Sequence, residues 1–222
     1  MSKLNILIGA NLSKTYGELA VVKDVSLSVK DGEFVSLVGK SGCGKTTLLS
    51  LLSGLERPTK GQVMLNGKEI TDASEDELAL FRRDNVGFIF QSFNLIPTLS
   101  AWENVALPLF PITMTEAERR NRATQFLEQM EMGHRTEHLP SALSGGEKQR
   151  VAIARSLINY PKIVFADEPT GNLDTATGDA IMAILNKLHM EQGMTLLMVT
   201  HEPELARTAD RVIRMQDGEV IS

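Results

Sequence analysis

The chain has 222 residues, of which 42% are hydrophobic and 23% charged, a composition that suits one globular domain with a sizeable core. Its 23 Lys and Arg residues against 28 Asp and Glu residues give a net charge of −5, which disfavours binding to a nucleic-acid backbone. No apolar run approaches the roughly 18 residues of a membrane span, and one cysteine excludes an internal disulfide framework. We therefore expect no nucleic-acid partner, no direct membrane insertion and a cytoplasmic location.

The N-terminal third is interpreted as strands separated by turns. Residues 1–10 hold one Lys, a short apolar stretch and no convincing cleavage site, which favours the beginning of a strand over a signal peptide. Asn66 with Gly67 is the strongest hairpin signal in the chain, and Asp31 with Gly32 marks another turn. The strands predicted around these turns cover residues 4–12, 21–29, 33–38, 61–65 and 68–70.

The middle of the chain, residues 74–157, has a mostly helical pattern. Ser74 with Glu77, and Thr115 with Glu118, predict two helices that begin with capping boxes. The last third alternates strands with helices, which predicts a parallel α/β sheet into which the helical middle is inserted. The predicted strands there are residues 162–166, 195–200 and 212–215, and the helices are residues 177–192 and 203–210.

A glycine-rich loop follows the third predicted strand and precedes a helical run, and its sequence matches G-x-x-x-x-G-K-[ST]. Glycines let the backbone wrap around phosphate oxygens, and the start of the following helix adds partial positive charge. Lys45 supplies a charge for the β- and γ-phosphates, and the Thr46 hydroxyl is a ligand for Mg²⁺. The predicted nucleotide-binding loop consists of Gly39, Lys40, Ser41, Gly42, Cys43, Gly44, Lys45, Thr46 and Thr47.

Two adjacent carboxylates end a short apolar run that has the character of a buried parallel strand. Asp167 and Glu168 follow residues 163–166, at the strand end where ligands of open α/β sheets bind. Adjacent side chains of an extended segment point in different directions, so one carboxylate can face Mg²⁺ while its neighbour faces the attacking water. We therefore assign Asp167 to Mg²⁺ and Glu168 to the general base.

A second candidate anion site stands at the beginning of another helical segment. Ser144, Gly145, Gly146 and Glu147 precede it, and a serine hydroxyl, backbone N–H groups and the helix dipole together suit an anion. Taken alone, the same residues are better interpreted as an ordinary helix N-cap with flexible glycines.

These motifs occur in one chain, which over its full length resembles the ATP-binding cassette (ABC) ATPases. Tyr16 stands where that family stacks adenine, Gln91 matches its Q-loop, and residues 143–147 match its signature. Residues 163–167 match Walker B and residues 172–174 the D-loop. Finer motifs are similar to the lipoprotein-release and macrolide-exporter branch, which includes LolD-like, MacB-like and YbbA-like ATPases. The resemblance also gives two further matches, Glu168 as the catalytic glutamate and His201 as the switch histidine.

The resemblance implies a role for each of these residues. The catalytic set is Lys45, Gln91, Glu168 and His201, and the Mg²⁺ ligands are Thr46, Gln91 and Asp167. The remaining ATP contacts, besides the glycine-rich loop, are Tyr16, Ser144, Gly145, Gly146, Glu147 and Asp174.

The fold implied is a RecA-like P-loop core with an antiparallel β subdomain and an inserted helical subdomain. We expect one domain over residues 1–222, with residues 1–91 and 159–222 in the core and β subdomain and residues 92–158 in the helical subdomain. Because the chain holds one P-loop and one signature, activity is expected to need a head-to-tail homodimer that forms with ATP. Its partner would be a separate membrane permease, which would hold the ATPase at the cytoplasmic face of the inner membrane.

Two alternatives remain open at the level of the sequence. The chain could instead be a non-transport ABC ATPase that acts on nucleic acid or ribosomes, although its acidic charge and short length disfavour this. The apolar stretch of residues 93–109, with Trp102, is either core of the helical subdomain or a docking surface for the permease. Different side chains could serve each purpose.

Overall fold

The computed structural model describes residues 4–221; residues 1–3 and 222, which the expectations for the N-terminus and the domain include, lie outside the described residues. The strands are β1 (Asn5–Tyr16), β2 (Leu19–Lys30), β3 (Phe34–Val38), β4 (Lys60–Leu65), β5 (Lys68–Glu69), β6 (Val86–Phe90), β7 (Ile163–Asp167), β8 (Leu196–Thr200), β9 (Arg211–Gln216) and β10 (Glu219–Ile221). The helices are α1 (Lys45–Leu52), α2 (Glu75–Asn85), α3 (Ala101–Ala106), α4 (Glu116–Gln129), α5 (Gly145–Leu157), α6 (Thr175–Gln192) and α7 (Pro203–Ala206), with short 3₁₀ turns at Leu107–Leu109, Gly133–Arg135 and Pro140–Ala142.

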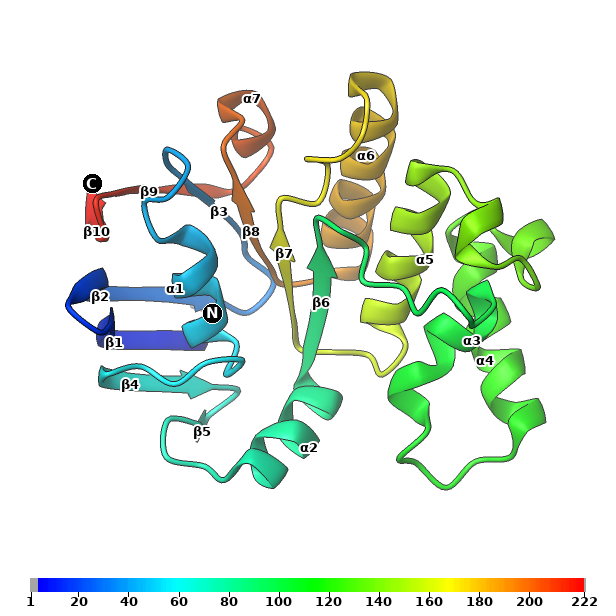
Figure 1. Ribbon diagram of the computed structural model, residues 1–222, viewed down its shortest axis with the longest axis horizontal. Coiled ribbons are helices and arrows are strands. Elements are labelled where there is room, and N and C mark those ends of the chain that lie inside the picture. The colour runs from blue at the N-terminus through cyan, green and yellow to red at the C-terminus, as the bar shows by residue number, and fades with distance from the viewer. Residues whose placement is uncertain (1–3, 222) are drawn as a thin grey trace.

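The larger sheet has the strand order β10-β9-β3-β8-β7-β6. All neighbours in it run parallel except the edge strand β10, which pairs antiparallel with β9. The prediction of a parallel α/β sheet is therefore confirmed. Its strands β6, β7 and β8 end on one edge of the sheet (Figure 1), where parallel α/β proteins place their ligands.

A smaller antiparallel sheet, in the order β2-β1-β4-β5, lies beside the larger one (Figure 1). Helix α1 is packed between the two sheets, because Leu48 and Leu52 share one buried cluster with Leu7 of β1 and Leu37 of β3. The loop before α1 is therefore fixed by two sheets at once. The predicted hairpin at Asn66 and Gly67 joins β4 to β5, and both residues have positive φ.

Helices α3 to α6 pack on the other side of the larger sheet and with one another (Figure 1). The side chains of strand β7 belong to the two hydrophobic clusters on opposite faces of the larger sheet. Val164 and Ala166 belong to the cluster of the helices, whereas Ile163 and Phe165 belong to the cluster around α1. This alternation follows from the period of two in a β-strand, and it leaves both faces of the strand buried.

Residues 74–157 are mostly helical, as predicted. Strand β6 also lies within this stretch and pairs with β7, which was not expected. Its five residues follow α2 without a Gly or Pro break, so the sequence gives no boundary there. The last helix covers only Pro203–Ala206 rather than residues 203–210, and the short edge strand β10 was not expected.

The apolar stretch of residues 93–109 contains both buried and exposed side chains. Trp102 is 8% exposed and packs in the core of the helices, with Arg120 over its ring, whereas the side chain of Ile96 is exposed. The reading of Trp102 as core is the correct one. Between residues 4 and 221, no helix combines the length and the apolarity that crossing a bilayer requires.

Candidate active site

The glycine-rich loop has the backbone of an anion cradle. Gly44 precedes α1 with φ 101, and no side chain of the described residues caps the first turn of this helix. Helices α2 to α6, in contrast, all receive a side-chain cap. The amides at the start of α1 are thus left for a ligand. Gly39 is also required, because a Cβ there would lie 2.2 Å from the carbonyl oxygen of Met215.

Lys45 lies inside this loop rather than extending into solvent. Lys45 is 5% exposed, and its Nζ donates to the carbonyl oxygens of Gly39 and Lys40 at 2.8 and 2.9 Å. The Cys43 thiol, which is also buried, is 4.0 Å from Nζ. Lys45 and Thr46 line a pocket of about 190 Å³ that reaches Glu168. The ammonium group is therefore fixed at the wall of that pocket.

Thr46 and Asp167 join the loop to the end of β7. The Thr46 hydroxyl donates to Asp167 Oδ1 at 3.1 Å, although the two residues are 121 positions apart. Burial raises the pKa of Asp167, and the Thr46 hydrogen bond partly opposes this. A partly buried carboxylate beside a hydroxyl is an oxygen donor set of the kind that Mg²⁺ binds.

Glu168 and His201 form a contact at the ends of β7 and β8. His201 Nδ1 lies 3.2 Å from Glu168 Oε1. The backbone of Glu168 has φ 46, which is uncommon for a residue with a side chain, and its N–H donates to the Val199 carbonyl. Such strained residues concentrate at functional sites. His201 also lines a second pocket, of about 510 Å³, together with the P-loop residues Val38–Cys43.

Gln91 lies beside the same carboxylate, at the end of β6. A Cβ built at Gly171 would be 2.6 Å from Gln91 Nε2 and 3.3 Å from Glu168 Oε2, so both side chains border this glycine. Asn172 Nδ2 donates to the Gln91 carbonyl at 2.9 Å. The structure thus brings Lys45, Thr46, Gln91, Asp167, Glu168 and His201 to one edge of the larger sheet.

The signature residues lie in another part of the molecule. Ser144 caps α5: its hydroxyl accepts from the Glu147 N–H at 3.3 Å, and its own N–H donates to the Glu147 carboxylate at 2.8 Å. Of the described residues that line the two P-loop pockets, none comes from α5. Figure 1 places α1 and α5 on opposite sides of strands β6 to β8. A single chain therefore does not bring Ser144 to Lys45.

Glycines at the start of α5 also have a packing role. A Cβ at Gly146 would meet Thr177 Cγ2 at 2.5 Å, and one at Gly145 would meet Leu173 at 3.1 Å. Asp174 caps α6 by accepting from the Thr177 N–H at 3.0 Å. The beginnings of α5 and α6 are thus held against each other, whatever else these residues bind.

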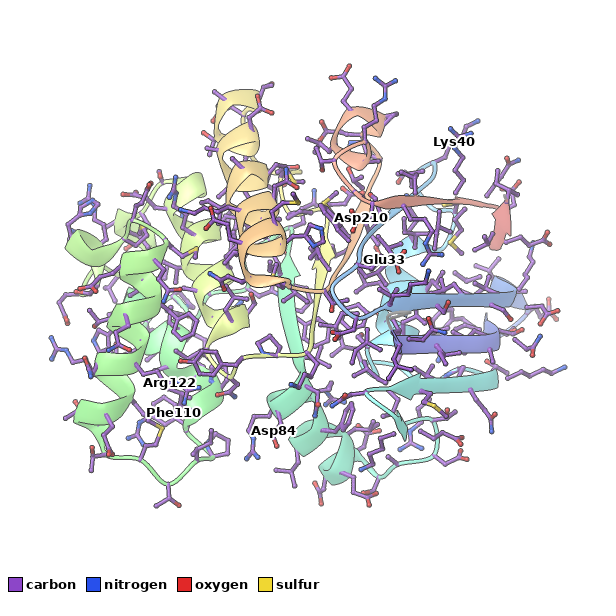
Figure 2. The ribbon with its side chains drawn as sticks, turned by 180° about the vertical axis from the view of Figure 1, so that it is seen from behind. Glu33, Lys40, Asp84, Phe110, Arg122 and Asp210 are labelled. Atoms are coloured by element: carbon purple, nitrogen blue, oxygen red, sulfur yellow. The ribbon has the colours of Figure 1, made fainter. Side chains whose placement is uncertain are left out.

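Tyr16, at the end of β1, has an exposed ring whose hydroxyl contacts Glu56. Sequence reasoning missed Glu56, as it missed Arg155, which donates to the carbonyl oxygens of Phe93 and Asn94. These partners are 40 to 62 positions apart along the chain, so no local motif marks them. In Figure 2, Lys40 of the P-loop lies at the opposite end of the molecule from Phe110 and Arg122.

Comparison with known proteins gives one family. The family model for ABC transporters matches residues 22–171. The uncharacterized ABC transporter ATP-binding protein YbbA of Escherichia coli K12 is 48% identical over 220 residues, which are 97% of this chain and 96% of YbbA. The macrolide export ATP-binding/permease protein MacB of Rhodopirellula baltica is 48% identical over 209 residues, which are 91% of this chain but 30% of MacB.

A solved structure agrees along nearly the whole chain. The ATP-binding cassette MJ0796 of Methanocaldococcus jannaschii, a dimer in a post-hydrolysis state bound to ADP and Pi, is 46% identical and has a TM-score of 0.90 over 97% of both chains.

Proposed function

Because this chain belongs to the ABC transporter family of ATP-binding proteins, we propose that it works as a twofold dimer that powers a separate membrane permease. The chain has the ABC ATPase fold and falls in the branch of the macrolide exporter MacB and YbbA, as the sequence predicts. It is an ATP-binding cassette that hydrolyses ATP.

One observation carries the assignment of the ATP site: the Thr46–Asp167 hydrogen bond and the Glu168–His201 contact both lie beside the Lys45 pocket. The amides at the start of α1 and the Lys45 ammonium would bind the phosphates. Tyr16 would stack on the base. The P-loop glycines keep the backbone close enough for these contacts.

The residues present fit a magnesium ion. The Thr46 hydroxyl, the Asp167 carboxylate and the Gln91 amide oxygen would hold it, since all three are hard oxygen donors near the phosphate pocket. When bound, Mg²⁺ neutralises phosphate charge and raises the electrophilicity of the γ-phosphorus.

Hydrolysis then depends on the position of water. Glu168 would accept a proton from the water whose oxygen attacks the γ-phosphorus, while the bond to the β–γ bridging oxygen breaks and ADP leaves. His201 holds the Glu168 carboxylate at 3.2 Å and would also reach the γ-phosphate. Gln91 borders the same glycine, Gly171, as the Glu168 carboxylate and would orient the water.

The dimer follows from the separation of the two anion sites. Ser144, Gly145, Gly146 and Glu147 of a second copy would close over ATP that is held by Lys45 of the first. The dimeric MJ0796 structure supports this arrangement. Asp174, at the beginning of α6, would contact nucleotide or its neighbour at the same interface.

The permease surface is proposed to lie next to the Q-loop. A groove of about 340 Å³ there is lined by Leu55 of the core and by Asn94 and Pro108 of the chain that follows β6. The name of MacB joins an ATP-binding part and a permease in one protein, and this chain matches 30% of that protein. Docking would hold the protein at the cytoplasmic face of the inner membrane. Export, lipoprotein release and force transmission to periplasmic partners all remain compatible with it.

Replacement of the P-loop lysine tests the ATP site. Lys45→Ala should weaken ATP binding and remove hydrolysis, because no other ammonium lines the wall of the 190 Å³ pocket among its described residues. Lys187→Ala on the exposed side of α6 is the control and should hydrolyse ATP normally. Near-normal turnover by Lys45→Ala would refute the assignment.

Purification from a membrane extract tests the partner. The chain should co-purify with an integral membrane protein. Co-purification with ribosomes or nucleic acid instead would favour the alternative, a non-transport ABC ATPase.

A further inference from the structure

The hydroxyl of Tyr16 is tied to a carboxylate on another part of the chain. It donates to Glu56 Oε1 at 2.7 Å and lies 2.5 Å from Oε2. This hydrogen bond is the main reason that the pKa of Tyr16 is above its ordinary value of 10.0, so the hydroxyl stays protonated as the donor. One end of the ring is therefore anchored.

Lys14 covers one face of the same ring. Its Nζ is 5.1 Å from the ring centroid of Tyr16 and 3.6 Å from Glu56 Oε1, and it donates to the Arg57 carbonyl at 2.8 Å. The Lys14 side chain is only 15% exposed, whereas Tyr16 is 45% exposed. The ring thus has a covered face, occupied by an ammonium group, and an open face.

Glu56 stands on the segment that leaves the P-loop helix. Its N–H and that of Leu55 both donate to the Ser50 carbonyl in α1. The next residues are tied to β1, since Thr59 N–H donates to the Ser13 carbonyl at 2.7 Å. The carboxylate that anchors Tyr16 is therefore fixed to the helix whose other end forms the phosphate cradle.

We propose that Glu56 and Lys14 are positioning residues that hold Tyr16 as a one-sided stacking platform for the purine base of ATP, at a set distance from the P-loop. This inference rests on the proposed base contact of Tyr16. It adds that the platform is prepared before ATP arrives, and that the base can stack on the open face alone. The Lys14 side chain excludes the other face.

Loss of the Glu56 anchor should therefore lower the affinity for ATP without changing the rate of hydrolysis of bound ATP. A ring that is not anchored has to be ordered when the base stacks, and ordering one side chain weakens binding by about two- to tenfold. The phosphates would contact α1 and not Tyr16, so kcat should not be affected. A ligand without a base, such as inorganic tripolyphosphate, gains nothing from the anchor.

The test compares variants of the full chain by ATP titration calorimetry and steady-state ATPase kinetics. Glu56→Ala should weaken ATP binding about fivefold, with kcat within about twofold of normal, and Tyr16→Phe, which keeps the ring and removes the hydroxyl, should weaken ATP binding by a similar factor. The double variant should bind no more weakly than Glu56→Ala alone, because the Tyr16 hydroxyl has no carboxylate left to bind once Glu56 is removed. Glu56→Gln keeps an acceptor oxygen and should restore affinity.

Two controls separate the inference from other effects. Glu69→Ala, an exposed carboxylate on the same sheet, should bind ATP normally. Binding of tripolyphosphate should be equal in all variants, and an equal loss there would overturn the inference in favour of a distorted P-loop. Additive losses in the double variant, or normal affinity of Glu56→Ala, would also overturn it.

Tyr16→Ala distinguishes this inference from the function it rests on. Weak ATP binding by Tyr16→Ala together with normal binding by Glu56→Ala would overturn the positioning role only. Normal binding by Tyr16→Ala would overturn the base contact itself and the positioning role with it.

Discussion

Asp167 holds a negative charge where the protein favours the neutral side chain. Burial raises its pKa above the ordinary 3.8, and the neighbouring Glu168 carboxylate acts in the same direction. For an acid with a raised folded-state pKa, stability is complete below the unfolded-state pKa and is lost as the pH rises through the folded-state pKa. At pH 7 the folded protein therefore carries a penalty, which the Thr46 hydrogen bond and the Lys45 charge partly offset and a bound cation would relieve further.

Asp167→Asn should consequently make the protein more stable and less active. Its melting temperature at pH 7 should rise by a few degrees, because the penalty is removed, while Mg²⁺-dependent hydrolysis is lost with the carboxylate. The difference in stability should shrink as the pH falls toward the ordinary pKa of Asp. Thermal unfolding between pH 4 and pH 8 measures this, with Glu69→Gln as the exposed control. A lower melting temperature at pH 7 would contradict the account.

The site residues that the sequence predicts are those that local spacing marks. Lys45 and Thr46 follow from the glycine pattern, and Glu168 from its place after a buried strand. Their roles stay predictions, but the structure brings them together. Glu56 and Arg155 could not be found in this way, since a carboxylate in a loop and an arginine in a helix are ordinary until their distant partners are known.

At the scale of elements, capping boxes determine where several helices begin. Those at Ser74 and Thr115 are confirmed, and two more begin α3 and α5. Helix ends with such caps can be predicted because the cap and its partner are three residues apart. Strand β6 has no comparable signal, because its five residues acquire their structure by pairing with β7, which lies 77 positions further along the chain; Phe90, for example, pairs with Asp167.

The cap of α3 gives a prediction of stability. The Ser100 hydroxyl accepts from the Glu103 N–H, and both the hydroxyl and the N–H of Ser100 donate to the Glu103 carboxylate at 2.7 Å. Ser100→Ala should lower the free energy of unfolding by about 1 kcal/mol, or roughly 2–4 °C in melting temperature. Thr98→Ala, exposed on the preceding loop, is the control and should be neutral.

The effect of Ser100→Ala should also depend on pH. Hydrogen bonds from the Ser100 side chain and backbone lower the pKa of Glu103 below 4.5. For an acid with a lowered folded-state pKa, the stabilisation is present above the unfolded-state pKa and is lost as the pH falls through the folded-state pKa. The variant should therefore differ from the original chain more at pH 7 than at pH 3. An equal difference at both values would show that the carboxylate has no part in the cap.

The loop before α3 presents an apolar side chain to solvent. Asn104 is fully buried, and its amide bonds both the N–H and the carbonyl of Ile96. This fixes the backbone and leaves the Ile96 side chain 40% exposed. Ile96→Glu should reduce co-purification with the permease and leave ATP binding unchanged. Met190→Glu, at a residue of α6 that is 78% exposed, should have no effect on either. If the Ile96→Glu variant co-purifies with a normal amount of permease, the loop before α3 does not bind the permease.

At the scale of the whole molecule, the fold separates the two groups of residues that are expected to bind one ATP molecule. The layer around α1 holds the P-loop, and the helical layer holds Ser144 at the start of α5. The larger sheet lies between them (Figure 1), so the two cannot meet within one chain without unfolding it. In a head-to-tail pair of chains, the P-loop of each chain would face Ser144 of the other, and one symmetric interface would form both ATP sites.

Glu168→Gln should trap that pair. The amide keeps the shape of the side chain but cannot accept a proton, so ATP should bind and persist. Because ATP would contact both copies, the dimer should accumulate in Mg²⁺-ATP and dissociate when ATP is omitted. Sedimentation velocity with and without nucleotide measures this.

Adding Ser144→Arg to Glu168→Gln should abolish the dimer while ATP binding persists. Ser144 is exposed at the start of α5, so a large side chain is tolerated in the single chain but fills the gap that ATP must bridge. The Lys45 pocket is remote from it and should bind ATP normally in calorimetry. Thr113→Arg, exposed on the loop before α4, is the matched control and should leave the dimer intact. A Glu168→Gln, Ser144→Arg chain that still dimerises with ATP would show that the signature does not complete the partner's site.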